Sequence, residues 1–239
     1  MEKVAIIIPA YNEEDAIAAL ISNIHKISAK GNYSLHPIVI NDCSTDNTFQ
    51  IASELNCTVL NLPINLGIGG AVQCGYKYAY ANDYDLAVRI DGDGQHPPKE
   101  IVKLIEAYEK GKNDILIGSR FLDSSGFQSS IIRRFGIKYF QLLIRLFSGL
   151  KITDCTSGFR LLNKKVMELS TEYYPDEYPE PESIILFVKK GMRLGEVSVN
   201  MIERQGGISS INSFGSVYYL VKVSLAIFFT FIRLNFQNK

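Results

Sequence analysis

The sequence has few cysteines and no excess of charge of either sign. Its four cysteines are scattered over 239 residues and form no CxxC pair, which argues against a structural zinc site and for a reducing compartment. Lysine plus arginine and aspartate plus glutamate number 25 each, so no bulk charge points to nucleic acid as a partner. The start of the chain lacks the apolar core and cleavage site of a signal peptide, and we expect a cytoplasmic protein.

Internal repeats and low-complexity segments are also absent, and 46% of the residues are hydrophobic. This composition suits one α/β domain of ordinary size, alone or with a short appendage. In the first half, apolar β-branched runs alternate with helical patterns, which is typical of a parallel sheet covered on both faces. We therefore expect a Rossmann-like βαβ domain over about the first 123 residues. Strands are predicted at residues 4–9, 37–42, 58–63 and 85–91, and helices at residues 13–27, 46–55 and 69–81.

The second half contains an amphipathic segment at residues 129–150. Apolar residues recur there at helical spacing, and Arg134, Lys138 and Arg145 form a basic stripe. One interpretation is a core helix with one solvated side. The other is a helix that lies on a membrane surface.

The tail at residues 216–234 is apolar almost all round, with Lys222, Thr230 and Arg233 along one narrow edge. It approaches the roughly 20 residues that are needed to span a bilayer, although a lysine within the span is unfavourable. A core helix or a dimer helix is the alternative. We favour membrane association, with residues 1–215 as the main domain and residues 216–239 as an apolar C-terminal membrane-associating helix.

Two aspartates, Asp91 and Asp93, directly follow the fourth predicted strand, each with a glycine after it. In open α/β sheets, ligands bind beyond the carboxyl ends of the strands. One carboxylate can contact a nucleotide or a metal and the other a divalent ion, because Mg²⁺ and Mn²⁺ bind few carboxylates together with substrate phosphate oxygens. The alternative is a simple turn, since Asp and Gly are common turn residues.

Polar loops also follow the first two predicted strands. Asp42 and Asp46 come after the second strand and are expected at the same sheet edge as Asp91 and Asp93. Asp46 or Ser44 could instead cap the next helix. Three polar loops at one edge favour a ligand site over capping alone.

The sequence contains five motifs in this order: IIIPAYNEE, NDCSTDNT, NLGIGGAVQCGYKYA, DGDGQHPP and TSGFRLLNKKV. Together they resemble family 2 glycosyltransferases of the GT-A fold, and most of all the branch with dolichyl-phosphate mannose synthases and bacterial polyprenyl-phosphate sugar transferases. The resemblance covers residues 4–211. It implies a nucleotide-diphosphosugar donor, a divalent metal (Mg²⁺ or Mn²⁺), and inversion at the anomeric carbon.

The motifs assign expected roles to several residues. Asp93 and Gln95 would hold the metal, and Asp91 would contact the donor or the metal. Asn41 stands where many relatives carry aspartate, so the identity of the base, uracil or guanine, stays open. The other residues expected at the nucleotide sugar are Pro9, Tyr11 and Glu13, Asp42 at the base, and Gly69 in a glycine-rich helix start near the phosphates.

Three arginines could stabilise the negative charge that develops on the leaving nucleoside diphosphate. Arg204 is the first candidate, with a solvated surface arginine as the alternative, and Arg120 and Arg160 are its rivals. The family also places an acidic residue that faces the acceptor in the region of residues 178–200. We prefer Glu182 for this role, and Glu180 also qualifies.

The sequence therefore predicts an inverting glycosyltransferase at the cytoplasmic face of the cell membrane, with a UDP- or GDP-sugar as donor and polyprenyl phosphate as acceptor. One alternative is transfer to a hydroxyl of a polysaccharide or glycolipid. A second is a sugar-phosphate nucleotidyltransferase, although PAYNEE is not the glycine-rich loop expected there. A third is an inactive homologue that serves as a membrane-docked partner subunit. A homo-oligomer or a small membrane-protein partner is compatible with any of these.

Overall fold

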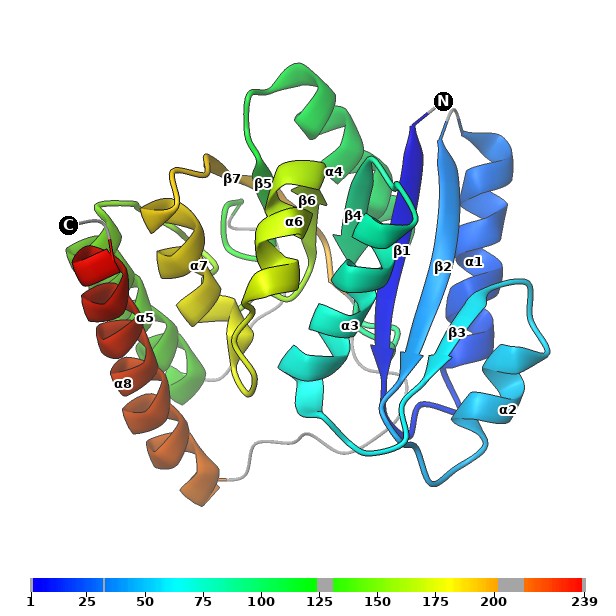
Figure 1. The fold of residues 1–239 in the computed structure, drawn as a ribbon, viewed down its shortest axis with the longest axis horizontal. Helices are drawn as coiled ribbons and strands as arrows, with labels where there is room; N and C mark the ends of the chain where they lie inside the picture. Colours follow the sequence, from blue (N-terminus) through cyan, green and yellow to red (C-terminus); the bar gives the residue numbers. More distant parts are fainter. Residues whose placement is uncertain (1, 32, 124–130, 202–212, 238–239) are drawn as a thin grey trace.

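The fold is organised around a seven-stranded sheet with the strand order β3-β2-β1-β4-β6-β5-β7. The computed structural model describes residues 2–31, 33–123, 131–201 and 213–237 (Figure 1). The strands are β1 (Lys3–Ala10), β2 (Ser34–Asn41), β3 (Thr58–Asn61), β4 (Leu86–Arg89), β5 (Ile115–Ser119), β6 (Arg160–Asn163) and β7 (Leu194–Ser198).

Most neighbouring strands in this sheet are parallel. β1 lies between β2 and β4 and is parallel to both, and β2 pairs in parallel with β3. β5 and β7 are also parallel, whereas β6 runs antiparallel to both of its neighbours. The predicted Rossmann-like, mostly parallel sheet is confirmed, and strands β5 and β7 and the antiparallel strand β6 have no counterpart among the predicted strands.

Helices cover both faces of the sheet. On one face, α1, α2 and α4 share a core with Ile6 and Ile8 of β1, and on the other face α3 and α5 to α8 share a core with Ile7. Burial on both faces explains why β1 reads as an uninterrupted apolar run. The helices are α1 (Ile17–Lys30), α2 (Thr48–Ser53), α3 (Gly67–Ala81), α4 (Lys99–Lys110), α5 (Ile131–Ser148), α6 (Lys164–Glu172), α7 (Pro179–Lys189) and α8 (Ser213–Gln237).

The predicted helices of the first half are confirmed, with shifted ends. α1 begins at Ile17 rather than at residue 13, because the carbonyl of Glu13 accepts from the amides of Ala16 and Ile17 in a turn that leads into the helix. Glu13 therefore belongs to the loop between β1 and α1 and lies near the end of β1. α3 begins at Gly67, two residues before the predicted start.

Helix α8 has one face packed on the domain and one face exposed. Val223, Ile227, Thr230 and Leu234 are buried where α8 packs on α5 and α7. The segment Tyr218–Phe236 is nevertheless long and apolar enough to cross a membrane, judged by length and composition alone. The large apolar side chains that α8 exposes are Tyr218, Val221, Leu225, Phe228, Phe229 and Phe236.

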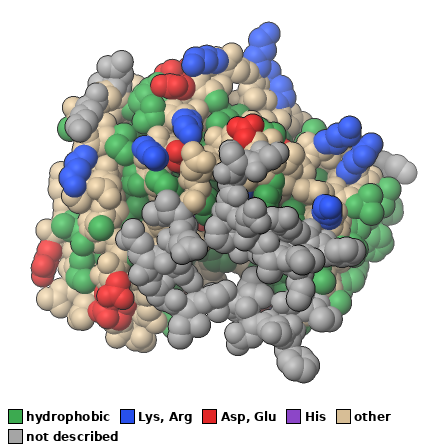
Figure 2. All heavy atoms as spheres, turned by 180° about the vertical axis from the view of Figure 1, so that it is seen from behind, with side chains coloured by type: hydrophobic (Ala, Val, Ile, Leu, Met, Phe, Trp, Pro, Cys, Tyr) green, Lys and Arg blue, Asp and Glu red, His purple; other side chains and the backbone are tan. Residues whose placement is uncertain are grey.

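Helix α5 lies beside α8 and has the same two-sided character. It buries Ile137, Phe140 and Ile144, and the ring of Phe147 contacts the ring of Phe228 on α8 at 6.2 Å between centroids. Its exposed apolar side chains are Tyr139, Leu142 and Leu146. These side chains and the exposed ones of α8 are called the apolar face below. Figure 2 shows hydrophobic side chains along the right edge, where α5 and α8 lie in this reversed view.

The packed side of α8 can be tested on its own. We predict that Ile227→Ala lowers the free energy of unfolding by about 2–5 kcal/mol, because a fully buried side chain leaves a cavity. Leu225→Ala, on the exposed side of the same helix, should change it by less than about 0.5 kcal/mol. Urea unfolding followed by circular dichroism measures both values. Equal effects would mean that α8 is not packed on the domain in solution.

Candidate active site

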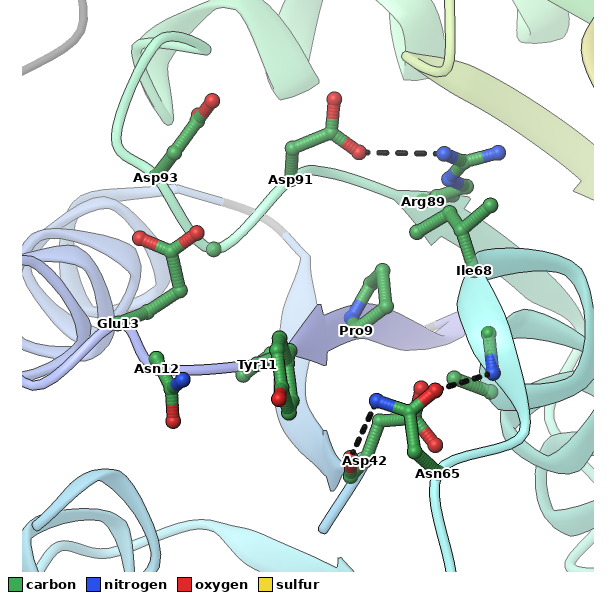
Figure 3. Close-up of a pocket in the computed structure, with 14 residues that line it drawn as sticks. Pro9, Tyr11, Asn12, Glu13, Asp42, Asn65, Ile68, Arg89, Asp91 and Asp93 are labelled. Atoms are coloured by element: carbon green, nitrogen blue, oxygen red, sulfur yellow. Dashed lines mark hydrogen bonds and ion pairs between the residues drawn. The ribbon is translucent and has the colours of Figure 1, made fainter. Parts of the chain in front are cut away.

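A cleft of about 800 Å³ lies at the carboxyl ends of β1, β2 and β4. The strand register aligns Ala10 with Asn41 and Ile7 with Arg89, so the loops that follow these strands begin side by side. Figure 3 shows the side chains of this cleft. The lining residues are Pro9, Ala10, Tyr11, Asn12, Glu13, Asp42, Asn65, Gly67, Ile68, Ala71, Arg89, Asp91, Gly92 and Asp93.

One corner of the cleft is formed by Asp42, Asn65 and Tyr11. Asp42 Oδ1 accepts from the amide of Leu66 at 2.7 Å, and Asn65 Nδ2 donates to the Asp42 carbonyl at 3.1 Å. Burial raises the pKa of Asp42, and the amides of Leu66 and Gly67 offset part of this rise. Tyr11 is 49% exposed and offers an aromatic surface at the mouth of this corner.

Asn41, the residue that departs from the family pattern, does not line this cleft. Its side chain is buried, and Nδ2 donates to Asn61 Oδ1 of β3 at 2.7 Å. The donor capacity of Asn41 is therefore used within the sheet. In the structure, Asn41 ties β2 to β3 at the point where both strands end.

The acidic corner contains Asp91, Asp93 and Glu13. The chain turns at Gly92 and Asp93, and Figure 3 shows the carboxylates of Asp91 and Asp93 on the same side of the cleft, with Glu13 near Asp93. Asp93 Oδ1 accepts from the amide of Gln95 at 2.9 Å. The Asp91 side chain is one third exposed, and the residue Asp93 is only 7% exposed.

Arg89 lies beside the acidic corner and carries a buried positive charge. Its guanidinium contacts Glu180 Oε1 at 2.7 Å and Asp91 Oδ1 at 3.3 Å. Burial would raise the pKa of Asp91, but the surrounding cationic groups, Arg89 first among them, together hold that pKa below its ordinary value. Asp91 is therefore ionised at neutral pH.

His96 supports the loop that carries Asp91 and Asp93. Its ring stacks on Phe159 with 5.1 Å between centroids, and Nδ1 accepts from the backbone amide of Asp91 at 3.2 Å. Burial lowers the pKa of His96, so the ring is neutral with its proton on Nε2. This arrangement favours a loop-supporting role over that of a metal ligand.

The acidic corner fits a hard divalent cation only in part. The described residues contain no group of three or more His, Cys, Asp or Glu side chains that could hold a metal ion. Asp91 and Asp93 nevertheless present two carboxylates on one side of the cleft. This suits Mg²⁺ or Mn²⁺, which complete their coordination with substrate phosphate oxygens and water. Gln95, the third expected ligand, is not among the residues that line the cleft.

The two candidate acids of α7 point in different directions, as residues two positions apart on a helix do. Glu180 contacts Arg89 at the cleft. Glu182 Oε1 accepts from the hydroxyl of Tyr173 at 2.9 Å and from that of Thr230 on α8 at 2.6 Å. For a role at the acceptor, the sequence analysis prefers Glu182. The geometry instead favours Glu180.

The candidate arginines have structural partners or lie outside the described residues. Arg120 is buried and donates to both carboxylate oxygens of Asp154 at 2.6 and 2.7 Å. Arg160 is 1% exposed and donates to the Ser183 hydroxyl and the Glu180 carbonyl. Neither lines the cleft. Arg204, within residues 202–212, is outside the described part of the chain.

Gly69, expected near the phosphates, does not line the cleft. Its amide donates to the Asp176 carbonyl at 2.7 Å, and a Cβ atom at this position would overlap the carbonyls of Pro175 and Asp176. The glycine therefore permits the start of α3 to contact the segment before α7. Gly67 and Ile68, its neighbours, are the residues of this helix start that line the cleft.

Several lining residues were not among the sequence candidates, namely Asn12, Asn65, Ile68, Ala71 and Arg89. Asn12 has a positive φ of 56°, and its Oδ1 accepts from the Thr45 amide at 2.8 Å, which joins the loops after β1 and β2. Arg89 could have been found, because a charged residue inside an otherwise apolar strand needs a partner.

Comparison with known proteins agrees with this fold and site. The sequence model of "Glycosyl transferase family 2" matches residues 5–169. A UDP-N-acetylglucosamine–dolichyl-phosphate N-acetylglucosaminyltransferase from Methanococcus voltae is 30% identical over 217 residues, which cover 82% of this chain and 84% of the relative. A polyprenol monophosphomannose synthase from Mycolicibacterium smegmatis is 27% identical over 221 residues, with 88% and 82% covered.

Among solved structures, glucosyl-3-phosphoglycerate synthase from Mycobacterium tuberculosis in complex with Mn²⁺, uridine diphosphate and glucosyl-3-phosphoglycerate has a similar fold. The TM-score is 0.68 at 18% identity, with 98% of this chain and 80% of that chain covered. The chain belongs to glycosyl transferase family 2 and is a glycosyltransferase with the GT-A fold. The expected family, enzyme class and fold are confirmed.

The choice between the two acids of α7 leads to a prediction. Glu180→Gln should lower the transfer rate about 10²-fold if this carboxylate positions the acceptor or takes a proton from it. Glu182→Gln should cause a much smaller loss, because its carboxylate contacts Tyr173 and Thr230 rather than the cleft. Initial rates of the two variants under the same conditions measure the difference. The reverse order would restore Glu182 as the acceptor-facing acid.

Proposed function

We propose that the protein transfers one sugar, with inversion, from a UDP- or GDP-sugar to a polyprenyl phosphate at the cytoplasmic face of the membrane. The observation that carries this proposal is the exposed apolar face of α5 and α8, because residues 176–178 connect α8 with the start of α3 at the cleft. Residues 1–215 would carry the chemistry and residues 216–239 the membrane contact, although α8 shares one core with the rest of the domain.

The link between α8 and the cleft is the short segment of residues 175–178. Tyr178 packs edge-on against Tyr219 of α8 at 4.6 Å between ring centroids, and Glu177 forms an ion pair with Lys222. On its other side, Asp176 accepts from Gly69 at the start of α3, next to cleft residues Gly67 and Ile68. A lipid held at the apolar face could therefore place its phosphate near the donor.

The two-sided packing of α8 favours a helix that lies on the membrane. A spanning helix would have to withdraw Val223, Ile227 and Leu234 from the core, at the cost of their buried apolar area. A helix that stays packed can still insert its exposed side into the boundary between head groups and acyl chains. Exposed Lys138, Arg145 and Arg233 would remain at the surface, where cations interact favourably with anionic lipids.

The corners of the cleft suit the parts of a nucleotide sugar. Asp42 and Tyr11 would contact the base and ribose, with Pro9 beside them. The diphosphate would lie near Asp91 and Asp93, where a bound Mg²⁺ or Mn²⁺ would neutralise the charge of the leaving group. Relatives named for dolichyl and polyprenol phosphate acceptors support the acceptor, and the fold neighbour crystallised with Mn²⁺ and uridine diphosphate supports the donor and the metal.

In the proposed reaction, a phosphate oxygen of the lipid attacks the anomeric carbon as the bond from that carbon to the nucleoside diphosphate breaks. A phosphate acceptor is already ionised at neutral pH, so it needs no base to remove a proton. Glu180 would then orient the acceptor rather than deprotonate it. A hydroxyl acceptor, by contrast, would need Glu180 as a base.

The direct test incubates membranes that contain the protein with a panel of labelled UDP- and GDP-sugars and then extracts the lipid. The proposal predicts that label from one donor enters the lipid fraction while the matching nucleoside diphosphate is released. Label in polysaccharide would instead favour a hydroxyl acceptor. No turnover of any donor would favour an inactive homologue that serves as a partner subunit.

The metal assignment gives a further prediction. Asp93→Ala should lower transfer at least about 10²-fold, because a cation aimed at the leaving group would lose a ligand. A chelator should have the same effect on the wild type, and added Mg²⁺ or Mn²⁺ should reverse it. Asp46→Ala is a suitable control, since Asp46 accepts from the amide and hydroxyl of Thr48 outside the lining of the cleft. Activity that survives both treatments would exclude the metal role.

The apolar face can be tested without truncation. The triple variant Leu225→Ser, Phe228→Ser and Phe229→Ser should move the protein from the vesicle-bound to the free fraction in flotation assays, because it removes exposed apolar area. Transfer to a short soluble acceptor phosphate should persist. Phe49→Ser, an exposed aromatic on α2, is the control. If the triple variant still floats with vesicles, the apolar face is not the membrane contact.

A further inference from the structure

We propose that Arg89 is a positioning residue for glycosyl transfer, whose buried guanidinium fixes Asp91 on the donor side and Glu180 on the acceptor side in a single arrangement. This inference rests on the proposed function, because it takes Asp91 and Glu180 as the groups that face donor and acceptor. It adds a residue that neither touches the reacting atoms nor belongs to the aspartate motif.

The geometry of the three side chains is that of a clamp. Arg89 Nη1 donates to Glu180 Oε1 at 2.7 Å, and Nη2 donates to Asp91 Oδ1 at 3.3 Å. The Arg89 side chain is 3% exposed, whereas those of Glu180 and Asp91 are 14% and 33% exposed. Asp91 and Arg89 line the cleft, and Glu180 contacts it through Arg89 (Figure 3 shows the contact between Arg89 and Asp91).

Stability alone does not explain a buried arginine at this position. Nε of Arg89 is buried and has no hydrogen-bond partner, and a buried unsatisfied donor is unfavourable. Buried ion pairs are often no better for stability than apolar side chains of similar size. The preceding strand residues Leu86, Ala87 and Val88 are buried and apolar, so an apolar residue would suit this strand. A requirement for charge at the cleft accounts for the exception.

The position of Gly158 is a second observation in favour of a fixed position of the Arg89 guanidinium. A Cβ atom at Gly158 would lie 2.8 Å from Arg89 Nη2 and 3.3 Å from Asp91 Oδ1. Any side chain there would push the guanidinium or the carboxylate away. The glycine of the SGFR motif thus makes room for the contact between Arg89 and Asp91.

The clamp joins two parts of the chain that serve different substrates. Asp91 follows β4, whereas Glu180 lies in the first turn of α7, the helix on which the membrane-facing α8 packs. Arg89 is the described side chain that contacts both carboxylates. Its loss should leave donor binding largely intact but misplace the acceptor side relative to the donor, and a misplacement of about 1 Å can cost about 10²-fold in rate.

The experiment compares Arg89→Lys and Gly158→Ala with the wild type. Lysine keeps the charge but lacks the planar fork that reaches two carboxylates, and the alanine displaces the fork without removing any polar group. Both should lower kcat by about 10²-fold and leave the donor KM almost unchanged. In a Glu180→Gln background, Arg89→Lys should cost much less, because one of its two partners is already altered.

Matched controls separate positioning from general damage. Gly136→Ala, whose Cβ would meet only Leu220 Cδ2 at 3.8 Å, and Asp114→Asn, in a salt bridge with Arg193 remote from the cleft, should keep kcat. Urea unfolding of every variant verifies that the protein is folded.

The outcomes distinguish the inference from the function on which it rests. Near-normal kcat in folded Arg89→Lys or Gly158→Ala, beside an active wild type, would overturn the positioning role alone. A loss expressed only in the donor KM would also overturn it, because Arg89 would then act in donor binding. A wild type that transfers no sugar from any donor would contradict the proposed function and this inference with it.

Discussion

The parallel alignment of β1, β2 and β4 is the constraint on which the site depends. Because these strands run in the same direction and in register, their carboxyl ends lie at one edge of the sheet. Asp42 follows β2 and Asp91 follows β4, and the loop after β1 supplies Tyr11 and Glu13 between them. A shift of one residue in any of the three strands would exchange the side chains that pack in the two cores, so the apolar cores also fix the geometry of the cleft.

The sequence was sufficient for strands β1 to β4 and for most residues that follow them. β1 and the second half of β2 are mostly apolar, and polar residues that follow a buried strand stand out from it, which is why Asp42 after β2 and Asp91 after β4 could be identified. The antiparallel β6 could not, because its four residues carry no period that distinguishes the direction of a strand. Arg120 and Arg160 were rivals of Arg204 for contact with the diphosphate, but their partners Asp154 and Ser183 come from segments that only the fold brings near.

The C-terminal half illustrates a second limit of sequence patterns. The apolar sequence of α8 is compatible with a core helix, a membrane-spanning helix or a helix on the membrane surface. Hydropathy alone does not distinguish these three cases. In the structure, Ile227 is buried while Leu225 and Phe229 are exposed on the same helix. Packing on one side and apolar exposure on the other explain why the sequence was compatible with both interpretations. The same helix also explains the orientation of Glu182, whose carboxylate is bonded to Thr230.

The most direct test of the account is the choice of acceptor by the purified protein. Vesicles would carry either a polyprenyl phosphate or the polyprenol of the same chain length, with the donor and divalent metal held constant, and the lipid product would be extracted and identified by mass spectrometry. The account predicts a glycosyl phosphate lipid from the phosphate and no product from the alcohol. Transfer to the alcohol, or equal transfer to both, would contradict it.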